Sequence, residues 1–189
     1  MEYNDYWYWN KEIPHETCQK IINLGKGNWN PENKTEPEQR DGECKHEVVR
    51  VNDQWVYDLI WDYMLAANEI AGWKYDIVAA ESCQIARYGK DRFYNWHVDG
   101  MGSHNCTHYV PENKALHGNT RKLSMSIVLN SDFEGGDFEI GGLDEERKCP
   151  RLEEGSIIVF PSFMDHRVAP VTKGIRYSLV TWFVGPPFK

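Results

Sequence analysis

The feature that most constrains the fold is a change of sequence pattern at Gly72. Beyond it, short segments rich in β-branched and aromatic residues alternate with glycine-containing turns such as FEGGD and IGGLD. Segments of this kind predict short antiparallel strands. We expect such strands at residues 74–79, 82–88, 122–130, 137–140, 156–160, 167–171 and 175–184.

The residues before Gly72 predict two helices. Residues 14–24 place apolar side chains on one side, and residues 53–71 carry apolar side chains at helical spacing. Residues 25–47 are polar and contain proline, which predicts a long loop with room for one strand. Two helices followed by many short strands predict a mainly β (α+β) fold, a helix-backed sandwich or small barrel of the jelly-roll kind.

Length and composition narrow the class of protein. The chain of 189 residues predicts a single domain over 1–189, with 1–72 as helical support and 73–189 as the jelly-roll core. The net charge of −8 argues against a protein whose main function is to bind the phosphates of nucleic acid. The sequence contains no apolar run long enough to span a membrane and no signal peptide, so we expect a cytoplasmic protein without a membrane partner. The five cysteines form no CxxC pair and are expected to be reduced.

A metal site is predicted by the stretch FYNWHVDG. His97 and Asp99 are two residues apart, and side chains at this spacing on one strand share a face. A second histidine, His166, follows far downstream. Together the three residues have the sequence form of a 2-His-1-carboxylate iron site, which leaves coordination positions open, unlike a closed four-ligand zinc site. The alternative is a polar strand end with hydrogen-bonded histidines.

An arginine, Arg176, lies ten residues after His166 in the stretch HRVAPVTKGIRYSLVTWF. A hairpin through Thr172–Gly174 would bring Arg176 back alongside the metal. Alternation along the next strand puts Arg176, Ser178 and Trp182 on one face. A buried guanidinium and a hydroxyl form a receptor for a carboxylate, and the distal carboxylate of 2-oxoglutarate suits it. Tyr88 can add a phenol hydrogen bond.

The segment 100–120 is longer than a loop that only connects two strands usually is, and it predicts a lid beside Asp99. Within it, His104, Cys106 and His108 form either a second metal site or redox-sensitive element, or a polar loop that contains them by chance.

Several stretches resemble the Fe(II)/2-oxoglutarate-dependent dioxygenases of the prolyl 4-hydroxylase-like branch, nearest to the PKHD-type bacterial hydroxylases. They are RYGKDRFYNWHVD, RKLSMSIVLN followed by EGGDFEI, LEEGSIIVFPS and HRVAPVTKGIRYSLVTWF. The resemblance implies a double-stranded β-helix with His97, Asp99 and His166 as iron ligands. It also implies Arg176 as the 2-oxoglutarate anchor, assisted by Tyr88 and Ser178.

The resemblance further implies substrate contacts for Arg121, Trp182 and Tyr94. Without it, Arg121 would be expected to pair with a carboxylate on the barrel surface. Many prolyl 4-hydroxylases carry lysine where Arg176 stands, as the PKHD type does not. The segment 100–120 matches nothing in the family.

The expected activity is hydroxylation of a prolyl residue in a peptide or protein, with release of succinate and CO2. The implied cofactors are Fe(II), 2-oxoglutarate and O2, with ascorbate as reductant. The alternatives are hydroxylation of a free amino acid or other small molecule, and a non-catalytic cupin-like metal-binding module. Oxidative demethylation of nucleic acid uses the same chemistry, but the acidic charge and the lack of a basic, aromatic-interleaved stripe count against it.

Overall fold

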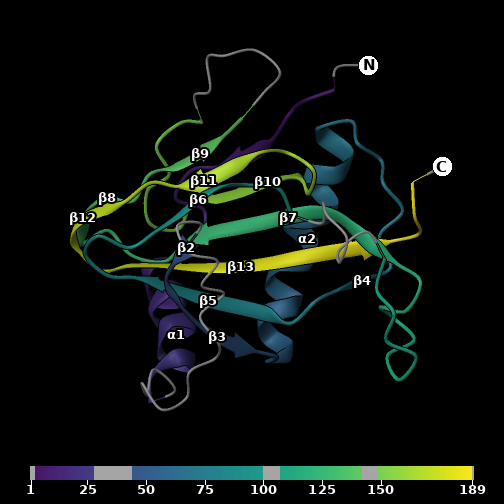
Figure 1. Cartoon of the computed structure of the whole chain (residues 1–189), viewed down its shortest axis with the longest axis horizontal. Helices are drawn as coiled ribbons and strands as arrows, with labels where there is room; N and C mark the ends of the chain where they lie inside the picture. The colour runs from purple at the N-terminus through teal and green to yellow at the C-terminus, as the bar shows by residue number, and fades with distance from the viewer. Residues whose placement is uncertain (1–2, 28–43, 100–106, 142–148, 189) are drawn as a thin grey trace.

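The structure, a computed structural model, describes residues 3–27, 44–99, 107–141 and 149–188. In these ranges it contains two helices and thirteen strands (Figure 1). The helices are α1 (His15–Gly25) and α2 (Gln54–Ile70). The strands are β1 (Trp7–Trp9), β2 (Cys44–Lys45), β3 (Glu47–Val51), β4 (Ala79–Ala80), β5 (Cys83–Tyr88), β6 (Phe93–His97), β7 (Thr120–Val128), β8 (Phe133–Gly135), β9 (Phe138–Ile140), β10 (Ile157–Pro161), β11 (His166–Val168), β12 (Val171–Gly174) and β13 (Arg176–Gly185).

The strands form two main antiparallel sheets. The major sheet has the order β1-β10-β7-β13-β5-β3, with β4 paired to β13. The minor sheet has the order β2-β6-β11-β9, and β12 pairs with β8 as a separate ribbon. Apolar side chains from both sheets, among them Tyr88, Phe138 and Phe160, form a core between them. The predicted jelly-roll architecture is confirmed.

The two helices cover one face of the major sheet (Figure 1). Both predicted helices are confirmed, and their observed bounds differ from the predicted ones by one residue at each end. Alternation along β7 explains how one strand serves two environments. Leu123 and Met125 pack in the helix-side core, whereas Ser124 between them faces the other sheet and reaches Asp99.

Two strand predictions are wrong. Residues 74–79 are mostly irregular, and only the short β4 begins at Ala79. The predicted strand 167–171 is divided between β11 and β12, which belong to different sheets. Residues 1–72 are also more than helical support, because β1 and β3 form the two edges of the major sheet. Edge pairing depends on distant partners, so local pattern gives little sign of it.

Two β-bulges decide which side chains face the space between the sheets. In β7, Leu123 pairs with Phe183 and Arg121 with the next residue, Val184, so Lys122 is an extra residue. In β6, His97 and Tyr94 pair with β11 residues only two apart. A bulge reverses the alternation beyond it. Arg121 and Tyr94 are thereby turned toward the side of Ser124 and His97, where the candidate site lies.

Among the described residues, neither helix combines the length and apolar character needed to cross a bilayer.

Candidate metal and cosubstrate site

Three ligand-type side chains converge between the sheets. His97 ends β6 and His166 begins β11, and the two residues are direct pairing partners. The ligand atoms of His97, Asp99 and His166 all lie within 4.8 Å of one another. The predicted shared strand is corrected in one detail: β6 ends at His97, and Asp99 lies just beyond it. The His-x-Asp spacing nevertheless brings the carboxylate to the two rings.

Backbone carbonyls orient both imidazoles. His97 Nδ1 lies 2.7 Å from the Asn95 carbonyl oxygen, and His166 Nδ1 lies 3.0 Å from that of Met164. These acceptors favour the tautomer in which Nδ1 carries the proton, so Nε2 keeps its lone pair. The Nε2 atoms of His97 and His166 lie 3.8 and 3.4 Å from the Asp99 carboxylate. The lone pairs and the carboxylate therefore surround one point.

The protonation states suit metal binding. Asp99 is buried, and Ser124 Oγ donates a hydrogen bond of 2.8 Å to its Oδ2. Burial alone would raise the pKa of Asp99, but its electrostatic interactions with His166 and Arg121 hold the pKa below its usual range. Burial and the neighbouring His166 lower the pKa of His97 to about 4. At neutral pH the cluster presents a carboxylate and a neutral His97 imidazole, the forms that bind a divalent metal.

Arg176 is the most deeply buried charge near this cluster, with 1% of its surface exposed. Its Nη1 donates to Ser178 Oγ at 3.0 Å, and its guanidinium lies 5.5 Å from the centre of the Tyr88 ring. In the described part of the chain, no carboxylate lies within ion-pair distance of it. Burial lowers the pKa of Arg176, yet arginine stays charged in proteins. A buried cation without a counter-ion is costly, so this position calls for an anionic ligand.

The EGGD turn makes room for Arg176. Gly136 has a φ of +65°, and a Cβ atom there would lie 2.8 Å from Val171 Cγ2 and 3.0 Å from Arg176 Cδ. The predicted hairpin at Thr172–Gly174 is wrong, because these residues belong to β12, which pairs with β8. Arg176 instead reaches Tyr88 because the two residues are direct partners in the β13–β5 ladder.

Arg121 is held by a carboxylate that sequence reasoning missed. Its Nε and Nη2 donate to the two oxygens of Glu81 at 2.6 and 2.7 Å. Its guanidinium lies 4.0 Å from the centre of the Trp182 ring. His108 Nε2 also lies 3.0 Å from Glu81, so the described end of the segment after Asp99 is attached to the same group. Glu81 belongs to no motif, and only the fold brings it to Arg121.

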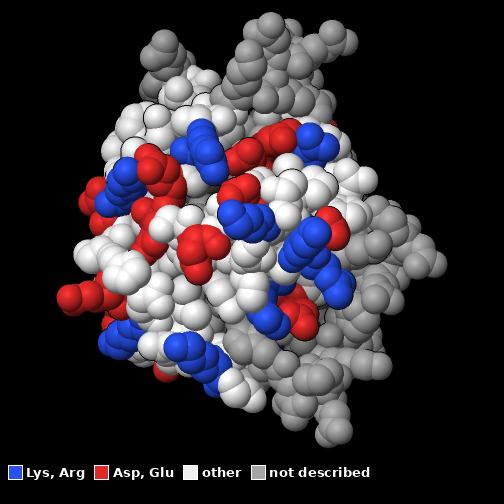
Figure 2. All heavy atoms as spheres, turned by 90° about the vertical axis from the view of Figure 1, so that its left-hand side faces the viewer, with Lys and Arg blue, Asp and Glu red and all other residues white. Residues whose placement is uncertain are grey.

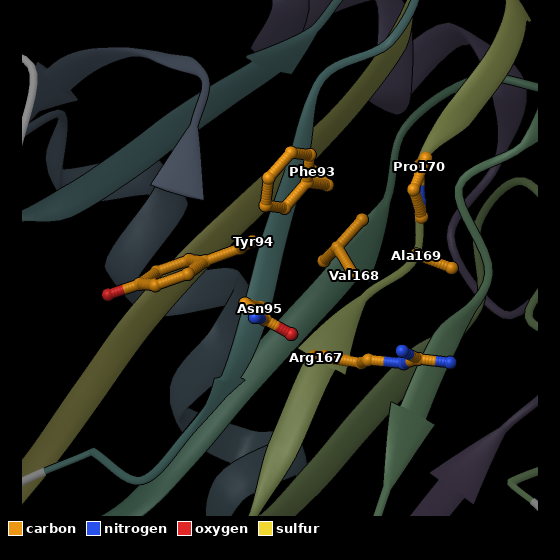
Figure 3. A pocket seen from close by; sticks show the side chains of 7 residues that line it. All are labelled: Phe93, Tyr94, Asn95, Arg167, Val168, Ala169 and Pro170. Atoms are coloured by element: carbon orange, nitrogen blue, oxygen red, sulfur yellow. The ribbon is translucent and has the colours of Figure 1, made fainter. Parts of the chain in front are cut away.

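Tyr94 stacks on a candidate ligand, with its ring centre 3.6 Å from that of His97. A hollow of about 170 Å³ lies nearby, lined by Phe93, Tyr94, Asn95, Arg167, Val168, Ala169 and Pro170. Figure 3 shows the Tyr94 ring directed away from Arg167 and Ala169. Arg167 is already paired with Glu139 at 2.9 and 3.1 Å. None of His97, Asp99 and His166 lines this hollow, although Tyr94 borders both the hollow and His97.

Of the three residues in the HNCTH stretch, only His108 lies within the described residues. His104 and Cys106 fall outside them, so the prediction of a second metal site stays a prediction.

Comparison with known proteins agrees with this geometry. Residues 83–184 match the sequence profile of the 2OG-Fe(II) oxygenase superfamily. The chain belongs to this superfamily. The matched region begins with β5 and ends within β13, so it contains the three converging ligands and Arg176. Membership implies Fe(II), 2-oxoglutarate and O2, and the two histidines, the carboxylate and the buried cation fit the first two of these.

The curated relatives include PKHD-type hydroxylases. One from Idiomarina loihiensis is 34% identical over 100 residues, and one from Picosynechococcus is 35% identical over 100 residues. Each alignment covers 52% of this chain but 39% of the relative, so the match spans well under half of those proteins.

Solved structures of prolyl hydroxylases share the fold. A Pseudomonas putida prolyl-4-hydroxylase aligns with a TM-score of 0.72 at 17% identity, over 95% of this chain and 91% of that one. A Trichoplax adhaerens prolyl hydroxylase in complex with a hypoxia inducible factor peptide fragment aligns with a TM-score of 0.69 at 15% identity, over 95% and 83%. At these identities the likeness establishes the jelly-roll fold alone.

Proposed function

We propose that this oxygenase hydroxylates a prolyl residue in a peptide or protein and releases succinate and CO2. The observation that carries the 2-oxoglutarate dependence is Arg176, a buried cation without a carboxylate partner among the described residues. It packs on Tyr88, which belongs to the core between the two sheets. When bound, iron and 2-oxoglutarate together activate O2 for insertion of one oxygen atom into a C–H bond.

The residues of the chain have separate tasks in this proposal. His97, Asp99 and His166 hold Fe(II), and Ser124 fixes the orientation of the Asp99 carboxylate through its hydrogen bond. Arg176 binds the distal carboxylate of 2-oxoglutarate with the help of Ser178 and Tyr88. Ascorbate keeps the iron reduced.

The charge state of Arg121 supports a peptide substrate. Glu81 engages two of its three guanidinium nitrogens and compensates its charge. A compensated guanidinium that still offers N–H groups suits an uncharged acceptor such as a peptide carbonyl. A free amino acid would instead bring a carboxylate, which favours an uncompensated cation. Trp182 beneath the guanidinium and Tyr94 beside His97 add the aromatic walls of the substrate site.

Surface charge counts against a nucleic-acid substrate. Figure 2 shows acidic and basic side chains interspersed on the face it presents, rather than gathered in a basic stripe. The net charge of −8 points the same way.

The test is mass spectrometry of candidate substrates. The protein is incubated with Fe(II), ascorbate and 2-oxoglutarate, together with proline-containing peptides, free proline and other amino acids. We expect one added oxygen on a peptidyl proline, matched by succinate, and no succinate from an Asp99→Ala variant. Oxygen added only to a free amino acid would replace the peptide assignment. Bound iron without consumption of 2-oxoglutarate on any substrate would favour a non-catalytic metal-binding module.

A further inference from the structure

His46 lies where the chain crosses between the two sheets. It stands between β2, in the minor sheet, and β3, in the major sheet. Its Nδ1 atom is buried and has no hydrogen-bond partner among the described residues. The sequence around it carries no motif, and the proposed iron and 2-oxoglutarate ligands do not include it.

The ring of His46 is held in a stack of aromatic side chains. Its centre lies 5.0 Å from that of Tyr88 and 5.2 Å from that of Tyr94, with interplanar angles of 17° and 27°. Tyr94 in turn stacks on His97, and the Arg176 guanidinium lies over Tyr88. The stack therefore connects the proposed carboxylate anchor with the proposed metal ligands, and His46 is at its middle.

Packing alone does not explain a histidine at this position. A phenylalanine could fill the space between two tyrosine rings without leaving a buried nitrogen unpaired. Burial and the nearby His97 lower the pKa of His46 to about 4. The ring is neutral at physiological pH and offers one N–H donor and one acceptor. An unpaired polar atom in a region that must accept a dianionic ligand is a candidate for binding that ligand.

We propose that His46 is a cosubstrate-binding residue whose Nδ1 donates a hydrogen bond to bound 2-oxoglutarate. The inference rests on the proposed function. It adds a fourth side chain, from the N-terminal part of the chain, to a site otherwise formed by Tyr88 on β5 and by Arg176 and Ser178 on β13. The stacking on Tyr88 and Tyr94 would hold the imidazole ready, so that little ordering is needed when the ligand binds.

The experiment measures 2-oxoglutarate binding without turnover. Isothermal titration calorimetry is performed on the full chain loaded with Mn(II), for the wild type, His46→Phe and His46→Asn. Phenylalanine keeps an aromatic ring in the stack and removes both nitrogens, whereas the asparagine amide can place a donor near the position of Nδ1. We expect the dissociation constant to rise about tenfold or more for His46→Phe. For His46→Asn we expect a rise of about threefold or less.

Two further readouts separate binding from folding. Mn(II) affinity, measured by the electron paramagnetic resonance of free Mn(II), should be unchanged in all three proteins. The ligand-free His46→Phe protein should melt at the wild-type temperature or above, because no buried nitrogen is left unpaired.

The outcomes are distinct. Equal 2-oxoglutarate affinity in wild type and His46→Phe would overturn the assignment of His46, and so would an equal loss in the Phe and Asn variants. A wild-type protein that binds Mn(II) but not 2-oxoglutarate would instead refute the proposed function itself.

Discussion

Replacement of Arg176 by methionine should have opposite effects on ligand binding and on the stability of the ligand-free protein. The residue is 1% exposed, and within the described part of the chain its guanidinium makes one hydrogen bond, to Ser178. A carboxylate bound by the guanidinium fork gains two charge-assisted hydrogen bonds, each contributing about 1.5–3 kcal/mol. Their loss should weaken 2-oxoglutarate binding by roughly 10² to 10⁴-fold.

Without ligand the same substitution removes a buried charge that has no carboxylate within ion-pair distance among the described residues. The free energy of unfolding should stay the same or increase by about 1–3 kcal/mol. Calorimetric titration of the Mn(II)-loaded protein and denaturant unfolding of the metal-free protein measure the two effects. Arg167→Met is the matched control, because Arg167 is paired with Glu139 and its side chain is 33% exposed. The reasoning is refuted if Arg176→Met binds 2-oxoglutarate within about twofold of the wild type, a margin well below the loss of one such bond.

Three further predictions concern stability. Gly136→Ala should destabilise the protein by about 1–3 kcal/mol more than Gly118→Ala in denaturant unfolding. Both glycines have positive φ, but only at Gly136 does the new Cβ meet other atoms, so equal losses would contradict the packing argument. Glu81→Gln should cost about 2 kcal/mol, against about 0.5 kcal/mol or less for Glu134→Gln in an exposed pair; similar losses would deny the Arg121 fork a special role. Finally, the stability of the ligand-free protein should fall as the pH is lowered from about 6.5 to about 4. In this range His46 is protonated in the unfolded chain but stays neutral in the folded protein, where its pKa is about 4. In His46→Phe that decline should be smaller, and an identical pH profile would remove His46 as a source.

The candidate iron ligands and the proposed 2-oxoglutarate anchor, Arg176, could be predicted from the sequence because each belongs to a short motif. His97 and Asp99 are separated by one residue, so the local backbone already brings them together, and His166 and Arg176 lie in one continuous stretch. Glu81 and His46 belong to no motif. Their importance comes from contacts with residues far along the chain, Arg121 for the first and Tyr88 and Tyr94 for the second.

The positions of two predicted site residues also depended on features that alternation does not reveal. The bulge at Lys122 turns Arg121 toward Trp182 instead of the helices, and the bulge in β6 turns Tyr94 onto His97. A bulge is a mismatch between two strands, so one strand's sequence does not contain it. The strand predictions at 74–79 and 167–171 failed for the same reason: whether a segment forms a strand, and in which sheet, depends on the segment that pairs with it.

By itself, the sequence determined the two helices, five of the seven strands predicted from it and the candidate side chains for iron and carboxylate binding, because periodicity and short-range spacing act within a few residues. Only the tertiary structure decided that Arg176 is buried without a carboxylate partner among the described residues and that Glu81 compensates Arg121. It also placed the His46 ring between two tyrosines, with no hydrogen-bond partner for its Nδ1 in the described part of the chain. Burial and charge compensation are properties of three-dimensional neighbourhoods, and these neighbourhoods form when strands distant in the chain pair and the two sheets pack together.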